Sequence, residues 1–84
     1  MSRPSHKSLE RALADAGSAH HDYEQIALGG ERDELWPGFY AAYVLGRVGD
    51  FISPSSLSHW LNEAPSGENW AESTAKYVLS NLQD

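Results

Sequence analysis

Apolar residues recur at helical spacing in four stretches of the chain, and the most apolar stretch lies near its middle. In it the apolar side chains follow at intervals of three and four residues: Trp36, Phe39, Tyr40, Tyr43, Val44 and Val48. Pro37 favours a first helical turn and Gly49 favours a helix end, so the pattern predicts a helix over 37–48. Because Leu35 and Leu45 widen its apolar side, we expect this helix to be buried on several sides, with its aromatic rings in the core.

A narrower apolar seam lies before this helix. Its positions alternate spacings of four and three, which predicts a helix over 5–28 that packs side by side with a neighbour: Leu9, Leu13, Ala16, His20, Tyr23 and Ala27. Ser5 is a suitable N-cap. Gly17 inside the helix costs about 1 kcal/mol relative to alanine, which indicates a close helix crossing or a bend. The short acidic segment 31–34 predicts that the first two helices are antiparallel neighbours.

Two shorter helices follow. Ser53 and Pro54 form a cap and first turn, and they predict a helix over 54–63 with Leu57, Trp60 and Leu61 on its inner side. The last helix is predicted over 70–82, where Asn69 and Glu72 have the spacing of a capping box. No alternating run is long enough for a strand. The sequence therefore predicts an all-α fold, a compact four-helix bundle-like single domain over residues 1–84.

The composition narrows the classes of partner. Twelve acidic and six basic side chains give 84 residues a formal charge of -6, which disfavours binding to a phosphate backbone. The chain has no cysteine, so a disulfide framework and a thiolate zinc site are excluded. No apolar run approaches the roughly 20 residues that a membrane-spanning helix needs. We therefore expect a cytoplasmic protein that does not bind membranes and for which a nucleic acid is a disfavoured partner.

The candidate chemistry gathers at one end of the first two helices. His20 and Glu24 are four residues apart and share a helix face, and Asp33 and Glu34 follow in the segment that returns past them. Three interpretations remain open: His20 is a seam histidine held by a carboxylate, the cluster binds a divalent ion or small ligand, or these side chains lie at the surface without a role. The His-Glu-x-x-His spacing is missing, and no serine lies in a nucleophile motif. We therefore assign no metal, no cofactor and no catalytic residue.

A second pattern lies in the segment 52–61, where a serine-rich start precedes Leu57, Trp60 and Leu61. This arrangement is similar to the second helix of a helix-turn-helix, which enters the major groove of DNA. The segment contains no Arg or Lys, although contacts to bases and phosphates need hydrogen-bond donors. Helix-turn-helix binding to DNA is therefore the third-ranked hypothesis.

The first half of the chain also resembles short uncharacterised bacterial helical proteins and domains. The residues that carry the resemblance are His20-x-x-Tyr23-Glu24 and Asp33-Glu34-x-Trp36-Pro37-x-Phe39-Tyr40-Ala41. The resemblance implies a helical fold and brings no activity, cofactor or catalytic residue with it. It directs attention to five positions: His20, Glu24, Asp33, Trp36 and Tyr40.

Together these patterns favour a small non-enzymatic accessory or protein-interaction protein that acts through a helical, aromatic-rich surface. Its partner would be another protein or a second copy of the chain. The alternative is a binder of a small molecule or divalent metal at the end of the first helix pair. The candidate binding residues are His20, His21, Glu24, Asp33, Glu34, Trp36 and Tyr40.

Overall fold

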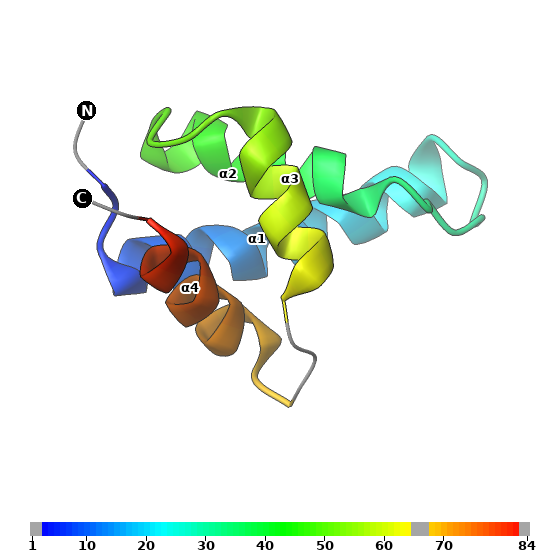
Figure 1. Ribbon diagram of the computed structural model, residues 1–84. Coiled ribbons are helices and arrows are strands. Elements are labelled where there is room, and N and C mark those ends of the chain that lie inside the picture. The colour runs from blue at the N-terminus through cyan, green and yellow to red at the C-terminus, as the bar shows by residue number, and fades with distance from the viewer. Residues whose placement is uncertain (1–2, 65–67, 83–84) are drawn as a thin grey trace.

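The computed structural model describes residues 3–64 and 68–82, and these residues form four helices and no strand (Figure 1). The helices are α1 (His6–Ile26), α2 (Trp36–Val48), α3 (Pro54–Glu63) and α4 (Trp70–Asn81). The predicted all-α, four-helix fold is confirmed, and each predicted helix end lies within two residues of the observed one. The remaining residues of the predicted domain, 1–2, 65–67 and 83–84, lie outside the described part.

The four helices enclose one core, to which each of them contributes buried residues. α1 packs against α2 and α4, and α3 packs against α2 and more lightly against α4. α1 and α2 are antiparallel, and the end of this pair with its connecting loop projects beyond α3 and α4 at the right of Figure 1. Within the described residues, no helix is both long enough and apolar enough to cross a membrane.

The helix starts agree with the sequence at two caps and differ at two others. Ser5 and Ser53 each accept a hydrogen bond from the backbone N–H three residues later, at 3.1 Å. The predicted capping box at Asn69 is wrong, because its side chain donates to the Glu72 carboxylate at 3.3 Å and makes no cap bond to the backbone. Helix α2 begins at Trp36, one residue earlier than predicted, and its N-cap Leu35 makes no side-chain cap bond.

The core is aliphatic, which contradicts the prediction of an aromatic core. All nine aromatic residues lie in the described part of the chain, and none is among the buried core residues: Leu9, Ala12, Leu13, Ala16, Ala41, Val44, Leu45, Leu57, Leu61, Ala75 and Val78. The alanines let the helices approach closely, so the interior has no room for large rings. The rings instead lie around the core with one side on it: Trp36, Tyr40, Tyr43, Phe51, Trp60 and Trp70.

The buried side of the first helix pair is also shorter than predicted. The α1 seam is buried as far as His20, whereas Tyr23 is 39% exposed and Ala27 is exposed. Leu35 is 80% exposed and does not belong to the buried side of α2. The reason is the projecting end of the α1–α2 pair, which α3 and α4 do not reach. Apolar side chains therefore remain at the surface of this end.

Candidate functional site

His20 is buried at the point where the α1–α2 loop folds back onto α1. Its Nε2 lies 3.0 Å from Asp33 Oδ2, and its Nδ1 lies 3.9 Å from Glu24 Oε2. The Glu24 carboxylate accepts a hydrogen bond from the backbone N–H of Asp33 at 2.8 Å. The other oxygen of Asp33 accepts from the N–H of Leu35 at 3.0 Å. His20, Glu24 and Asp33, here called the His20 latch, therefore fix the residues that lead into α2.

Aromatic rings enclose the latch on the side of α2. The centroid of the His20 ring lies 5.0 Å from that of Phe39, 5.4 Å from that of Tyr40 and 6.2 Å from that of Tyr23. Burial raises the pKa of Tyr40, and the nearby charge of Glu24 raises it further. A Cβ at Gly17 would lie 3.3 Å from the Tyr40 hydroxyl. The Tyr40 hydroxyl therefore lies close to α1 at Gly17.

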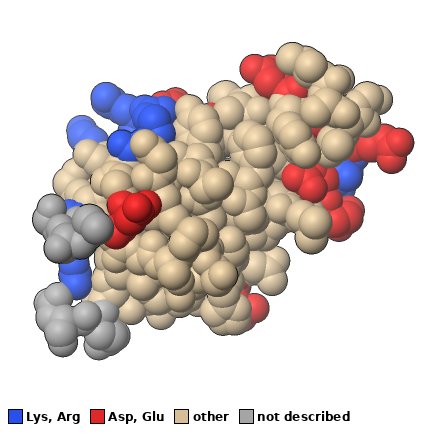
Figure 2. All heavy atoms as spheres, turned by 90° about the horizontal axis from the view of Figure 1, so that it is seen from above, with Lys and Arg blue, Asp and Glu red and all other residues tan. Residues whose placement is uncertain are grey.

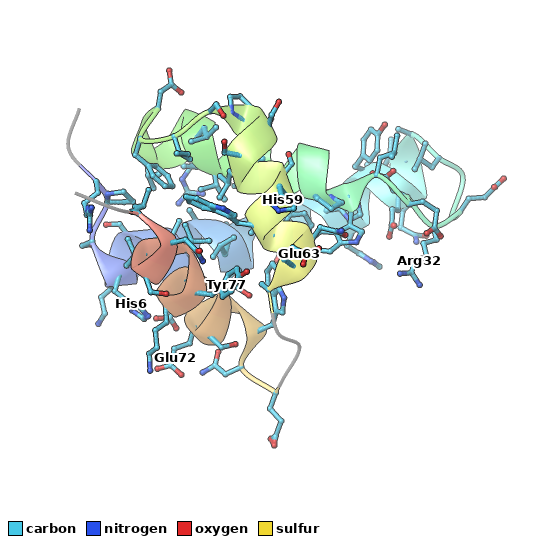
Figure 3. All side chains as sticks on the ribbon, in the orientation of Figure 1. His6, Arg32, His59, Glu63, Glu72 and Tyr77 are labelled. Carbon is cyan, nitrogen blue, oxygen red and sulfur yellow. The ribbon has the colours of Figure 1, made fainter. Side chains whose placement is uncertain are left out.

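The structure brings together only part of the predicted site. His21 and Glu34 are both exposed. Glu34 pairs with Arg32 at 3.4 Å, and Arg32 lies on the loop at the projecting end (Figure 3). Trp36 contacts the rings of Tyr40 and Trp70, with centroids 5.1 and 6.0 Å away, and takes no part in the latch. The latch is thus a smaller unit than the sequence suggested.

The geometry of the latch favours the first interpretation of His20, a seam histidine held by carboxylates. His20 and Asp33 bind each other, and Glu24 binds a backbone N–H, so each carboxylate already holds part of the loop. Within residues 3–64 and 68–82, no group of three His, Cys, Asp or Glu side chains is arranged to hold a metal ion. The chemistry of the arrangement is a hydrogen bond between the imidazole of His20 and the carboxylate of Asp33.

The His20 latch predicts that the stability of the fold depends on pH through the ionisation of Asp33. The hydrogen bond from His20 lowers the pKa of Asp33 below its usual value, with help from the N–H of Leu35 and against the effect of burial. A carboxyl whose pKa is lower in the folded state stabilises the fold above the unfolded pKa of about 4, and this contribution is lost as pH falls through the folded value. Asp33→Asn should therefore destabilise the protein at neutral pH and much less at about pH 3.

Urea unfolding of wild type and Asp33→Asn at both pH values measures this difference. Asp22→Asn is the matched control, because Asp22 is an exposed aspartate on α1 with the same change in charge. A difference between wild type and Asp33→Asn that stays the same at both pH values would show that the latch does not stabilise the charged form of Asp33.

The second candidate region is the outward side of α2, here called the α2 outer face, formed by Leu35, Gly38, Phe39, Ala42 and Gly46. Leu35, Gly38, Ala42 and Gly46 are exposed, and Phe39 is partly buried. No charged side chain occurs from Leu35 to Gly46. Seen from the side of α2 and α3 (Figure 2), the middle of the molecule is mostly uncharged, with most Lys and Arg at one end and most Asp and Glu at the other.

An aromatic row borders this face on the side of α1. The centroid of the Phe39 ring lies 5.2 Å from that of Tyr23 and 6.5 Å from that of Tyr43, with which it is stacked. The Arg47 guanidinium lies over the Tyr43 ring at 5.7 Å from its centroid and pairs with Asp15 at 2.9 Å. The row therefore ends in an arginine that is held in place by an aromatic ring and a carboxylate.

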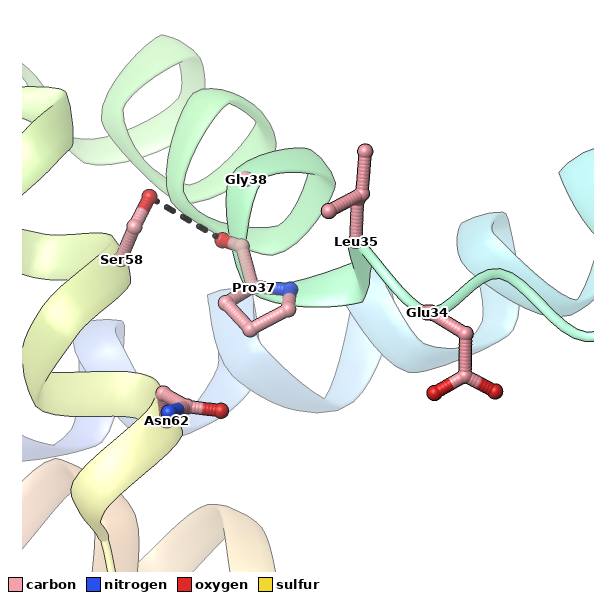
Figure 4. Close-up of a pocket in the computed structure, with 6 residues that line it drawn as sticks. All are labelled: Glu34, Leu35, Pro37, Gly38, Ser58 and Asn62. Atoms are coloured by element: carbon pink, nitrogen blue, oxygen red, sulfur yellow. Dashed lines mark hydrogen bonds between the residues drawn. The ribbon is translucent and has the colours of Figure 1, made fainter.

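A shallow pocket borders the face on the side of α3 (Figure 4). It has a volume of about 490 Å³ and is lined by Glu34, Leu35, Pro37, Gly38, Ser58 and Asn62. The Ser58 hydroxyl donates to the carbonyl of Pro37 at 3.5 Å and joins the two walls. The α2 outer face and the pocket thus share two residues, Leu35 and Gly38, and the pocket has both apolar and polar walls.

Sequence reasoning missed this face, although one signal was present. Gly38, Ala42 and Gly46 are spaced four residues apart and therefore lie on one side of a helix. A surface helix normally carries charged residues on its outward side, and this one carries small ones. The missing charges and the two glycines together mark the face.

The chain matches no protein-family model, no curated protein and no solved structure. The function is therefore inferred from the residues and their geometry.

Proposed function

We propose that the protein is a non-enzymatic interaction module that binds an α-helix of a protein partner on the α2 outer face. The observation that carries the proposal is the exposed, uncharged side of α2, where Leu35 is 80% exposed. The exposed positions of α3 and α4 are mostly polar by contrast: Ser55, His59, Asn62, Glu63, Glu72, Lys76 and Ser80. An apolar surface that one helix presents among polar neighbours is typical of a binding site.

The two glycines of the face support a closely packed helix as the partner. Glycine inside a helix costs about 0.5–1 kcal/mol relative to alanine. Among the described residues, nothing lies within 4 Å of a Cβ built at Gly38 or at Gly46, so contacts within the fold do not require glycine at either position. Small side chains do let a second helix backbone come close. A partner helix could thus pack closely against Gly38 and Gly46, which no part of the described fold contacts in this way.

The border of the face supplies the kinds of residue that anchor protein complexes. Aromatic residues and arginine are enriched at protein interfaces and at their strongest contacts. Tyr43 and Arg47 line one border beside Phe39 of the face, and the pocket beside Leu35 on the other border can accept a partner side chain. The proposal takes the cytoplasm as the compartment, with which a cysteine-free chain is compatible.

Photo-crosslinking in the source cells tests this function. A photoreactive amino acid at Ala42, in the middle of the face, is expected to give one discrete protein adduct that maps to a helical segment. The same amino acid at Ser80, an exposed position of α4, is the matched control and should give none. No adduct at Ala42, or equal adducts at both positions, would show that the face does not bind a protein.

A further inference from the structure

We propose that the partner helix is α2 of a second copy of this chain, packed antiparallel to the first. This inference rests on the proposed function and names the occupant of the same face. A two-fold dimer places one surface against itself, so the surface must be complementary to itself in shape and charge. The α2 outer face meets both requirements when the two helices run in opposite directions.

The first requirement is met by the order of large and small residues. In one antiparallel register Leu35 lies opposite Gly46 of the second copy, and Phe39 lies opposite Ala42 of the second copy. The two-fold axis repeats both pairs. Leu35 is 80% exposed, and no described residue lies within 4 Å of a Cβ at Gly46, so the large side chain and the space for it are both open in one chain. In a parallel two-fold pairing each residue faces its own copy, so Leu35 would lie against Leu35.

The second requirement is met by the charges at the two ends of the face. The C-terminal end of α2 packs against α1 at Asp15, which pairs with Arg47, and three further basic residues precede Asp15 in the chain: Arg3, Lys7 and Arg11. The other end of α2 follows the segment 31–34, which carries three acidic residues and Arg32, and Asp22 adds a further negative charge near the end of α1. Figure 2 shows this separation of charge along the molecule. An antiparallel pairing places each basic end beside an acidic end, whereas a parallel pairing places like charges together.

The extent of the face predicts a weak dimer. A stable interface usually covers about 800 Å² on each partner, and one side of a 13-residue helix with its borders covers less. The opposite charges at the ends should make the association weaker as salt is added. We therefore expect a monomer–dimer equilibrium that depends on both concentration and salt.

Sedimentation equilibrium of the purified chain tests the dimer. At high concentration and low salt the mass should rise toward twice the 9.3 kDa of one chain, and it should fall back when salt is added. Ala42→Glu places a charge in the middle of the face and should give a monomer. Lys76→Glu, at an exposed position of α4, is the control and should still dimerise. Circular dichroism should show that both variants remain folded.

Single cysteines test the antiparallel register, because the chain has none of its own. Leu35→Cys and Gly46→Cys, mixed and mildly oxidised, should form a disulfide with each other, and neither variant should form one alone. Like-with-like disulfides, a dimer that Ala42→Glu leaves intact, or a monomer at every concentration would overturn the inference. A monomer whose Ala42 crosslinks to a different protein in cells would overturn this inference alone and support the proposed function.

Discussion

Replacing Leu13 by alanine is expected to lower the free energy of unfolding by about 2–5 kcal/mol, the largest effect we expect from a single substitution. Leu13 is 1% exposed in the middle of α1, the helix that packs against both α2 and α4. Truncation leaves a cavity in an aliphatic core, and water does not fill an apolar cavity of this kind. A chain of this size is expected to have a total stability of about 5 kcal/mol, so the substitution removes a large part of it, and at the upper end of the range much of the variant should be unfolded at room temperature.

Leu35→Ala is the matched control for this prediction, because it removes the same atoms from a side chain that is 80% exposed. Urea unfolding at low protein concentration, where a weak dimer is dissociated, should show a change of less than about 0.5 kcal/mol. Equal losses of stability in the two variants would contradict the division of the leucines between core and surface.

The four helices could be predicted from the sequence because their signals are local. The apolar spacing, the caps at Ser5 and Ser53 and the glycine after Val48 depend on neighbouring residues in the chain. The spacing of His20 and Glu24 likewise placed the two side chains on one face of α1, and Asp33 was among the partners expected for His20. These features do not depend on which other helices each helix packs against.

The position of the aromatic rings could not be predicted, because it depends on how closely the helices approach. Spacing shows that Phe39 and Val44 lie on a helix, but not which of them faces the neighbours. The buried alanines bring the helices together, so Val44 enters the core and Phe39 remains partly exposed. The outward side of α2 follows from this arrangement, whereas the sequence pattern alone predicted a helix buried on several sides.

The second large effect is expected in the reactivity of position 42. The cysteine-free chain allows single-cysteine variants, and Ala42→Cys and Ser80→Cys each place one thiol at an exposed position. In the dilute purified chain both thiols should react with a maleimide at similar rates. In the source cells a bound partner would cover the α2 outer face, because a helix packed on it would exclude the reagent. Ala42→Cys should then react several-fold more slowly than Ser80→Cys.

The ratio of these two labelling rates in cells is the most direct test of the claim that the α2 outer face is a binding surface. It needs no knowledge of the partner, and it responds to any partner that keeps the face covered in the cell. If the face binds a partner, the ratio should be near one in the dilute purified chain, and position 42 alone should be protected in cells. Equal labelling of both positions in cells would contradict the claim.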